Sequence, residues 1–113
     1  MAAVSLITFD YLKEISGGDT DFQKEIVQTF LEEMANEISL LQAATASQSW
    51  SQVGSLAHKI KAPINMLCTE PLKLRILFIE KSAKKGEELH VLTEEVRLLI
   101  ADLEAAMTEL KSF

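Results

Sequence analysis

The sequence is poor in the residues that build several common kinds of functional site. Its 113 residues include one cysteine, four glycines and two prolines. The single cysteine, Cys68, excludes an internal disulfide framework and is typical of a reducing compartment. No glycine-rich phosphate loop, nucleophile elbow or H-E-x-x-H zinc motif is present. Because His58, Cys68 and His90 also lack the spacing of zinc ligands, we expect no metal site.

Basic residues and long apolar runs are scarce as well. Eleven lysines and arginines stand against 17 acidic residues, which gives a net charge of −6. Nucleic acid is therefore not an expected partner, because its phosphate backbone attracts basic surfaces. No apolar run approaches the roughly 18 residues of a membrane span, and residues 1–7 lack the basic leader of a signal peptide. We expect a cytoplasmic protein without direct membrane contact.

The apolar residues that are present recur with a helical period between a few glycine and proline breaks. They make up 48% of the chain, enough to form the core of one compact domain, and no strand pattern of period two is seen. The expected N-caps are Asp19 or Thr20, Ser49 or Ser51, and Thr69, and the glycine stops are Gly17-Gly18 and Gly86. The predicted helices cover residues about 10–16, 20–43, 50–67, 70–85 and 87–111.

This pattern predicts an all-α fold, an antiparallel four-helix bundle with a short additional N-terminal helix as a lid on one end. We assign residues 1–113 to a single domain, with residues 1–8 as a poorly ordered or capping segment. A bundle of this kind closes its core within one chain, so we expect a monomer. Trp50 and Phe113 are the aromatic residues that an apolar binding patch could use. We expect Trp50 instead to be buried in the bundle core or at one end of it.

The second predicted helix is amphipathic. Its expected core positions recur every three or four residues: Phe22, Ile26, Phe30, Met34, Ile38 and Leu41. The carboxylates are expected on the opposite, solvated side: Glu25, Glu32, Glu33 and Glu37.

His58 is the residue whose setting indicates chemistry. At about 100° per residue, the core face of its helix is opposite His58, and the ring points to solvent. That core face consists of Val53, Ile60, Ile64 and Leu67. Gly54 and Ala62 lie one turn to either side of His58, with Lys61 and Asn65 close by.

Two interpretations follow from this geometry. His58 is either an ordinary exposed histidine, with Gly54 marking a ragged helix start, or a nucleophile kept clear so that another protein's active site can dock over it. Neutral imidazole attacks a phosphoryl group well near pH 7, and a nearby ammonium helps to hold the anionic product.

The segment Leu56-Ala57-His58-Lys59-Ile60-Lys61 resembles the L-A-H-x-[LI]-K core of histidine-containing phosphotransfer (HPt) domains. The turn Gly17-Gly18-Asp19 and the helices on either side of the motif are also similar, so the resemblance covers about 100 residues. The chain departs from the family pattern at Ala62 and Cys68, where the family usually or often has glycine. The family fold is a four-helix bundle.

The resemblance implies a phosphorelay intermediate, a carrier without kinase activity of its own. His58 would accept a phosphoryl group from the aspartate of one receiver domain and pass it to another. The supporting roles that it implies are phosphate stabilisation by Lys61 and Lys59, space for the docking partner at Gly54 and Ala62, and receiver contacts at Gln52, Ser55 and Asn65. The implied partners are receiver domains and a hybrid sensor histidine kinase. The chain would need no cofactor, and Mg²⁺ would be held by the receiver.

Two other functions stay open. The segment His58–Pro63 is also similar to the H-E-x-[KR]-[TN]-P box of sensor kinase dimerisation domains, but Lys59 stands where that box has its acidic general base. The chain also has no room for an ATP-binding domain. The second alternative is a non-catalytic helical adaptor or interaction module, which would bind its partner through an apolar patch and in which His58 is incidental.

Overall fold

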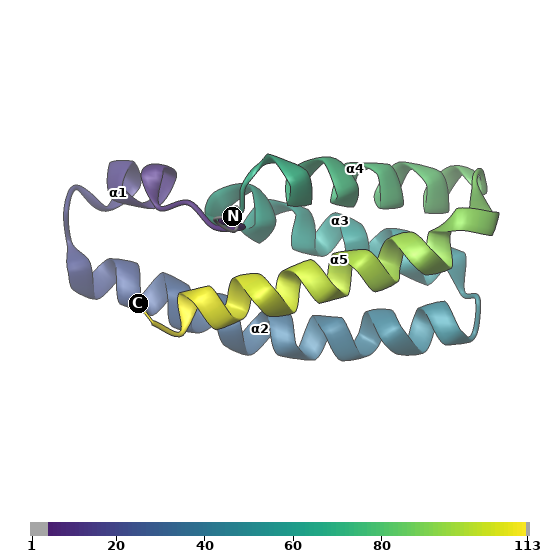
Figure 1. Cartoon of the computed structure of the whole chain (residues 1–113), viewed down its shortest axis with the longest axis horizontal. Coiled ribbons are helices and arrows are strands. Elements are labelled where there is room, and N and C mark those ends of the chain that lie inside the picture. The colour runs from purple at the N-terminus through teal and green to yellow at the C-terminus, as the bar shows by residue number, and fades with distance from the viewer. Residues whose placement is uncertain (1–4, 113) are drawn as a thin grey trace, which may run out of the picture.

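The computed structural model describes residues 5–112 and consists of five helices joined by short connections (Figure 1). They are α1 (Asp10–Ser16), α2 (Thr20–Ala46), α3 (Trp50–Leu67), α4 (Glu70–Lys85) and α5 (Leu89–Leu110). Within residues 5–112 there is no strand, and one isolated antiparallel bridge pairs Ile7 with Cys68. The predicted all-α class is confirmed.

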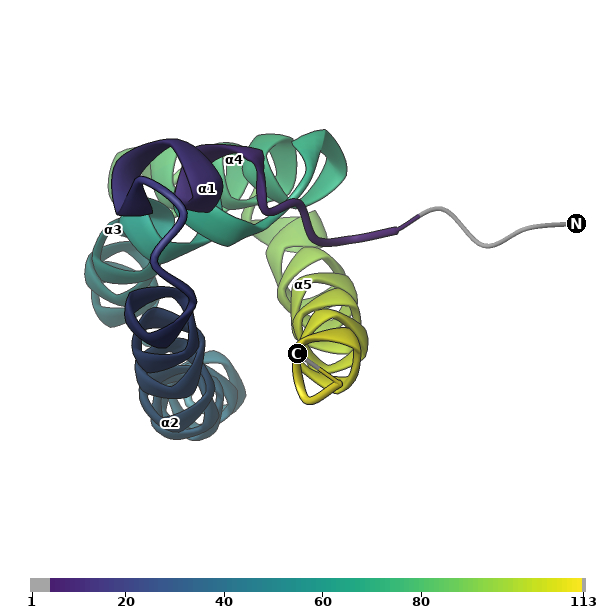
Figure 2. The same ribbon diagram turned by 90° about the vertical axis from the view of Figure 1, so that its left-hand side faces the viewer.

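Helices α2 to α5 run in alternating directions along the long axis of the molecule and surround a common core (Figures 1 and 2). Each of them packs against two of the others, in the cyclic order α2, α3, α4, α5, so the bundle is closed. The short helix α1 contacts α2 and α3 at one end of the bundle. The antiparallel four-helix bundle with an additional N-terminal helix is therefore confirmed.

Local sequence signals fix several of the helix ends, whereas Ser49 and Thr69 stand at the predicted N-cap positions of α3 and α4 without a side-chain cap hydrogen bond. The Asp19 carboxylate accepts a hydrogen bond from the backbone N–H of Phe22 at 3.1 Å and caps α2. Gly86 ends α4 with a φ of 69°, a conformation that glycine adopts without steric cost. Helix α3 continues through Pro63 to Leu67.

Two predicted boundaries differ from the structure. Helix α2 extends to Ala46, three residues further than predicted, and α5 begins at Leu89 rather than at Glu87. The later start of α5 follows from Glu88, whose φ of 56° lies outside the helical region.

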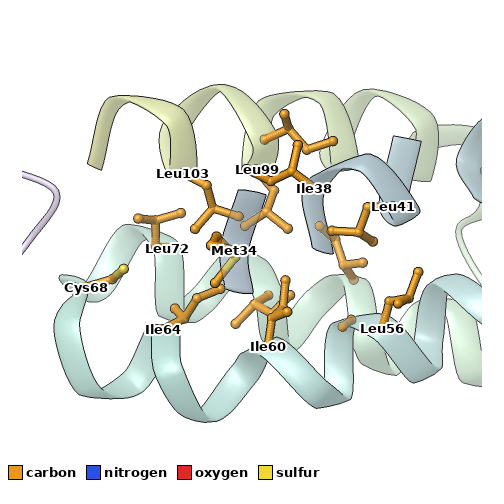
Figure 3. Packing of buried hydrophobic residues seen from close by; sticks show 14 of the residues in the cluster. Met34, Ile38, Leu41, Leu56, Ile60, Ile64, Cys68, Leu72, Leu99 and Leu103 are labelled. Carbon is orange, nitrogen blue, oxygen red and sulfur yellow. The ribbon is translucent and has the colours of Figure 1, made fainter. Parts of the chain in front are cut away.

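Apolar side chains from α2, α3, α4 and α5 meet along the axis of the bundle (Figure 3). Fully enclosed members include Leu41, Ile60, Ile64, Leu72, Leu99 and Leu103. Cys68, at the end of α3, is also completely buried among them. Trp50 is half-buried against the core, as predicted, whereas Phe113 lies outside the described residues.

Helix α2 corrects the predicted division into two faces. It projects beyond the ends of its neighbours (Figure 1), so Phe22 in its first turns is 42% exposed and Ile26 is half-buried. Glu37, predicted on the solvated side, is buried instead. It lies where α3 packs against α2, and its carboxylate pairs with Lys59 of α3.

Candidate functional site

His58 lies near the middle of α3 with 63% of its side chain exposed. The opposite face of the helix is buried in the core through Val53, Ile60 and Ile64. The imidazole therefore stands on the rigid wall of the bundle, where a partner can reach it.

The ring is held by a carboxylate from the neighbouring helix. Nδ1 of His58 lies 2.5 Å from Oε2 of Glu80 on α4, and Glu80 is only 8% exposed. Nζ of Lys61 donates to Oε1 of Glu80 at 2.8 Å, and Nζ of Lys84 donates to Oε2 at 3.1 Å. One buried carboxylate thus gathers an imidazole and two ammonium groups.

These contacts keep Glu80 ionised. The hydrogen bond from Lys61, with further hydrogen bonds from His58 and Lys84, outweighs the opposing effect of burial and lowers the pKa of Glu80 to about 2. An ionised carboxylate only accepts hydrogen bonds, so the hydrogen between the two side chains belongs to Nδ1 of His58.

The second ring nitrogen is left free as a result. In the neutral ring with hydrogen on Nδ1, Nε2 carries a lone pair, and no group among residues 5–112 hydrogen-bonds to it. An exposed imidazole nitrogen whose tautomer is fixed by a carboxylate is a nucleophile for an electrophile brought by another molecule.

A second lysine–glutamate pair lies on the other side of His58. Nζ of Lys59 lies 2.7 Å from Oε1 of Glu37 on α2, and this hydrogen bond raises the pKa of Lys59. The structure therefore brings Lys61 into the His58 network, whereas it directs Lys59 away from that network, toward α2.

Gly54 does not lie where the sequence interpretation placed it. It is buried, and a Cβ atom there would lie 2.9 Å from Cγ of Lys84 and 3.6 Å from Cβ of Ala83. Gly54 lies on the side of α3 that α4 covers, so its small size permits the close approach of the two helices. The expectation that it clears the docking face is wrong.

The other predicted docking positions lie on the surface. Ala62, one turn after His58 on the side facing α2, is exposed, and so are Gln52, Ser55 and Asn65. His90 has 77% of its side chain exposed and lies 3.8 Å from Glu88. It has no surroundings comparable to those of His58.

Sequence reasoning missed the roles of Glu80 and Glu37, because carboxylates were expected on solvated faces, and it missed the contact of Lys84 with Glu80. The spacing of Glu80 from the apolar residues of its own helix was a signal that it is buried. Glu80 follows the buried Ile76 by four residues and precedes the buried Ala83 by three, so it shares their face.

Burial suppresses the reactivity of the one thiol. Loss of hydration raises the pKa of Cys68 to about 12, so the group stays protonated at neutral pH. Across residues 5–112, no group of three or more histidine, cysteine, aspartate or glutamate side chains is arranged to hold a metal ion. No helix in this part of the chain is both long and apolar enough to cross a membrane.

Comparison with protein families shows which family the chain matches. The family described as "Hpt domain" matches residues 25–112, a span that contains His58, Lys61 and Glu80. Searches of curated proteins and of solved structures found no match.

Proposed function

The chain belongs to the Hpt domain family of phosphotransfer modules in two-component signalling, and on this premise we propose that it is a phosphorelay intermediate. Hpt domains carry phosphoryl groups rather than catalyse reactions, and they interact with response-regulator receiver domains. In the proposed relay, Nε2 of His58 accepts a phosphoryl group from the aspartate of one receiver and gives it to the aspartate of another. The observation that carries the proposal is the contact of 2.5 Å between Nδ1 and Glu80, which leaves Nε2 free.

The phosphoryl group moves in a single displacement. The lone pair of Nε2 attacks phosphorus and forms an N–P bond while the bond from phosphorus to the aspartyl oxygen breaks. The electron pair of that bond leaves with the aspartate carboxylate. No proton has to leave the ring, because Nδ1 keeps its hydrogen, and the phosphorylated ring is positively charged. Transfer to the second receiver is the reverse of this step.

Glu80 stabilises this charge. Its carboxylate is already ionised and hydrogen-bonded to Nδ1, so it needs no rearrangement as positive charge develops on the imidazole. A carboxylate that orients a histidine and stabilises its cation has the same role in serine protease triads. Glu80 is thus a positioning residue that acts through His58.

In the proposed relay, Lys61 and Lys84 contribute positive charge to the face that carries His58, where the phosphoryl group is negatively charged. Both ammonium groups are held by Glu80, one on each carboxylate oxygen. Phosphoryl transfer depends mainly on positioning and charge stabilisation, so a fixed histidine with nearby cations is sufficient on this side of the reaction. The receiver supplies its aspartate and Mg²⁺. Lys59 contributes less directly, because it pairs with Glu37.

The exposed face of α3 is the receiver's docking surface in this proposal. Ala62 lets a partner approach closely beside the ring, and Gln52, Ser55 and Asn65 offer polar contacts around it. A hybrid sensor kinase supplies the first phosphorylated receiver, and the domain acts as a monomer because its four helices close one core.

The test uses a panel of phosphorylated receiver domains with Mg²⁺. Wild-type protein and the His58→Gln and His90→Gln variants are incubated with each receiver, and acid-labile, base-stable label is measured. We expect label on the wild type and on His90→Gln, none on His58→Gln, and the same helical circular dichroism for all three. Label on His58→Gln, or no label on the wild type from any receiver, would contradict the proposal.

A further inference from the structure

The outward face of α4 exposes a row of large apolar side chains. Leu74, Leu77 and Phe78 are 58%, 48% and 38% exposed. Together with the exposed Lys81 and Lys85 they recur every three or four residues, so the five side chains form one stripe along the helix, here called the α4 stripe. Single exposed apolar residues are common on proteins, but three on consecutive turns form a patch that is typical of an interaction surface.

The α4 stripe borders a hollow that reaches the histidine site. The hollow has a volume of about 550 Å³ and is lined by Leu77, Phe78, Glu80, Lys81, Lys84 and Lys85. Oε2 of Glu80 lies 2.5 Å from Nδ1 of His58, and the same oxygen accepts a hydrogen bond from Nζ of Lys84 at 3.1 Å. The hollow therefore begins beside His58 and continues outward over α4.

A protein that docks over His58 extends beyond α3. Stable interfaces bury about 800 Å² on each partner, which is a patch roughly 30 Å across. Packed helices are only about 8–10 Å apart, and both α2 and α4 pack against α3. A partner centred on Nε2 of His58 therefore also covers α2 on one side, α4 on the other side, or both.

The two sides of His58 differ in charge. On the α4 side, Lys81 and Lys85 line the hollow, and neither pairs with a carboxylate among residues 5–112. On the α2 side, the exposed carboxylates of Glu25 and Glu33 line a hollow beside Ala62. An acidic partner is therefore attracted to α4 and repelled by α2, although the chain as a whole carries a net charge of −6.

We propose that the α4 stripe binds an acidic and apolar surface of the receiver, next to the receiver's phosphorylated aspartate. The inference rests on the proposed function and adds to it the side of His58 over which the receiver lies. The receiver's surface is acidic at this point because it holds Mg²⁺, which prefers carboxylate oxygens. Apolar side chains of the receiver lie against Leu77 and Phe78 in this arrangement, and its carboxylates pair with Lys81 and Lys85.

The experiment measures the dissociation constant of a receiver that labels His58, by calorimetry with Mg²⁺ at low and high salt. Leu77→Ala and Lys81→Glu alter exposed side chains of the α4 stripe. The matched controls are Ile15→Ala, at an exposed apolar residue of α1, and Lys24→Glu, at an exposed lysine of α2 that lies beside α5. Circular dichroism checks that all four variants keep the helical fold.

The two test variants should respond differently to salt. We expect Lys81→Glu to raise the dissociation constant by about tenfold at low salt and by less at high salt, because salt screens exposed charges. Leu77→Ala should raise it by about fivefold at both salt concentrations, because the lost contact is apolar. The controls should change it by less than about twofold. The transfer rate at saturating receiver should stay near the wild-type value in all four variants.

The acidic partner of Lys81 is found by replacing exposed carboxylates around the receiver's Mg²⁺ site with lysine, one at a time. One replacement should weaken binding to the wild type and restore binding to Lys81→Glu, which is the signature of a direct charge pair in a double-mutant cycle. Failure of every replacement to restore binding would contradict the pairing.

The outcomes separate the two proposals. If no receiver labels His58 in the wild type, the proposed function fails and the inference fails with it. If receivers label His58 but bind Leu77→Ala and Lys81→Glu as tightly as the wild type, the function stands and the inference is overturned. Equal weakening by Lys24→Glu would also overturn it, because the effect would then be one of net charge.

Two other occupants of the α4 stripe have readouts of their own. Co-sedimentation with vesicles of phosphatidylserine and phosphatidylcholine tests for a membrane surface, and analytical ultracentrifugation tests for a second copy of the chain. Either kind of binding, if Leu77→Ala abolished it and left the receiver's dissociation constant unchanged, would overturn the inference.

Discussion

Substitution of Glu80 is the most informative change at the site, because glutamine has nearly the shape of glutamate but carries no charge. Glu80→Gln keeps an oxygen that can accept from Nδ1 of His58 but removes the negative charge that stabilises the phosphorylated ring. Glu80→Ala removes the acceptor altogether, so the ring is free to take either tautomer. The matched control is Glu87→Gln, an exposed carboxylate just beyond the end of α4.

The size of the effect follows from the hydrogen bond. Bonds to ionised groups contribute about 1.5–3 kcal/mol and neutral ones about 0.5–1.5 kcal/mol, so Glu80→Gln loses on the order of 1.4 kcal/mol. This corresponds to a roughly tenfold slower transfer. Lys61 and Lys84 keep their charges, so part of the phosphate stabilisation remains. Glu80→Ala should lose more, because the ring then also spends time with its hydrogen on Nε2.

Rapid-quench measurement of transfer from a phosphorylated receiver gives the rate, and ¹⁵N spectra of the His58 ring give the tautomer. We expect hydrogen on Nδ1 in the wild type and a mixture of tautomers in Glu80→Ala. Wild-type rates in both variants, together with an unchanged ring spectrum, would refute the role assigned to Glu80.

Three further predictions concern stability and reactivity. The pKa of Glu80 lies at about 2, below its usual value of 4.5, so its network stabilises the fold fully above pH 4.5 and loses this contribution as the pH falls toward 2. Because the side chains of His58 and Lys84 are half or more exposed, the free energy of unfolding should fall by about 2 kcal/mol through this loss. Urea titrations at several pH values should therefore show a steeper loss of stability in acid for the wild type than for Glu80→Gln. An equal pH dependence of stability in the two proteins would contradict the prediction. Gly54→Ala should lower the free energy of unfolding by about 1 kcal/mol, because the new Cβ would lie 2.9 Å from Cγ of Lys84. This cost should exceed the gain from the better helix propensity of alanine. A higher melting temperature of the variant would contradict the close contact of α3 and α4. Cys68, fully buried and with a pKa of about 12, should react with iodoacetamide at pH 8 only after unfolding in guanidinium, and rapid labelling of the folded protein would show that the thiol is accessible.

The helices could be predicted from the sequence because their determinants are local. The apolar period, the Asp19 cap and the Gly86 stop are all visible within a few residues, and the structure confirms them. The exposure of Phe22 has a tertiary cause, because the start of α2 projects beyond its neighbours, and the later start of α5 has a backbone cause, the positive φ of Glu88.

The site could be predicted only in part, because half of it comes from another helix. His58 and Lys61 are three residues apart on α3, but Glu80 lies 22 and 19 residues further along the sequence and meets them through the packing of α4 on α3. The assignment of Gly54 failed for the same reason. Its helical position beside His58 was visible, but the helix that covers it was not.

The central claim is that Glu80 holds the hydrogen on Nδ1 so that Nε2 of His58 takes the phosphoryl group. The most direct test is combined ³¹P and ¹⁵N NMR of the ¹⁵N-labelled protein after phosphorylation by a receiver, because the phosphorus coupling identifies the nitrogen that carries it. We predict one phosphohistidine, at His58, with phosphorus bound to Nε2 and hydrogen retained on Nδ1. Phosphorus on Nδ1, or on any residue other than His58, would contradict the account.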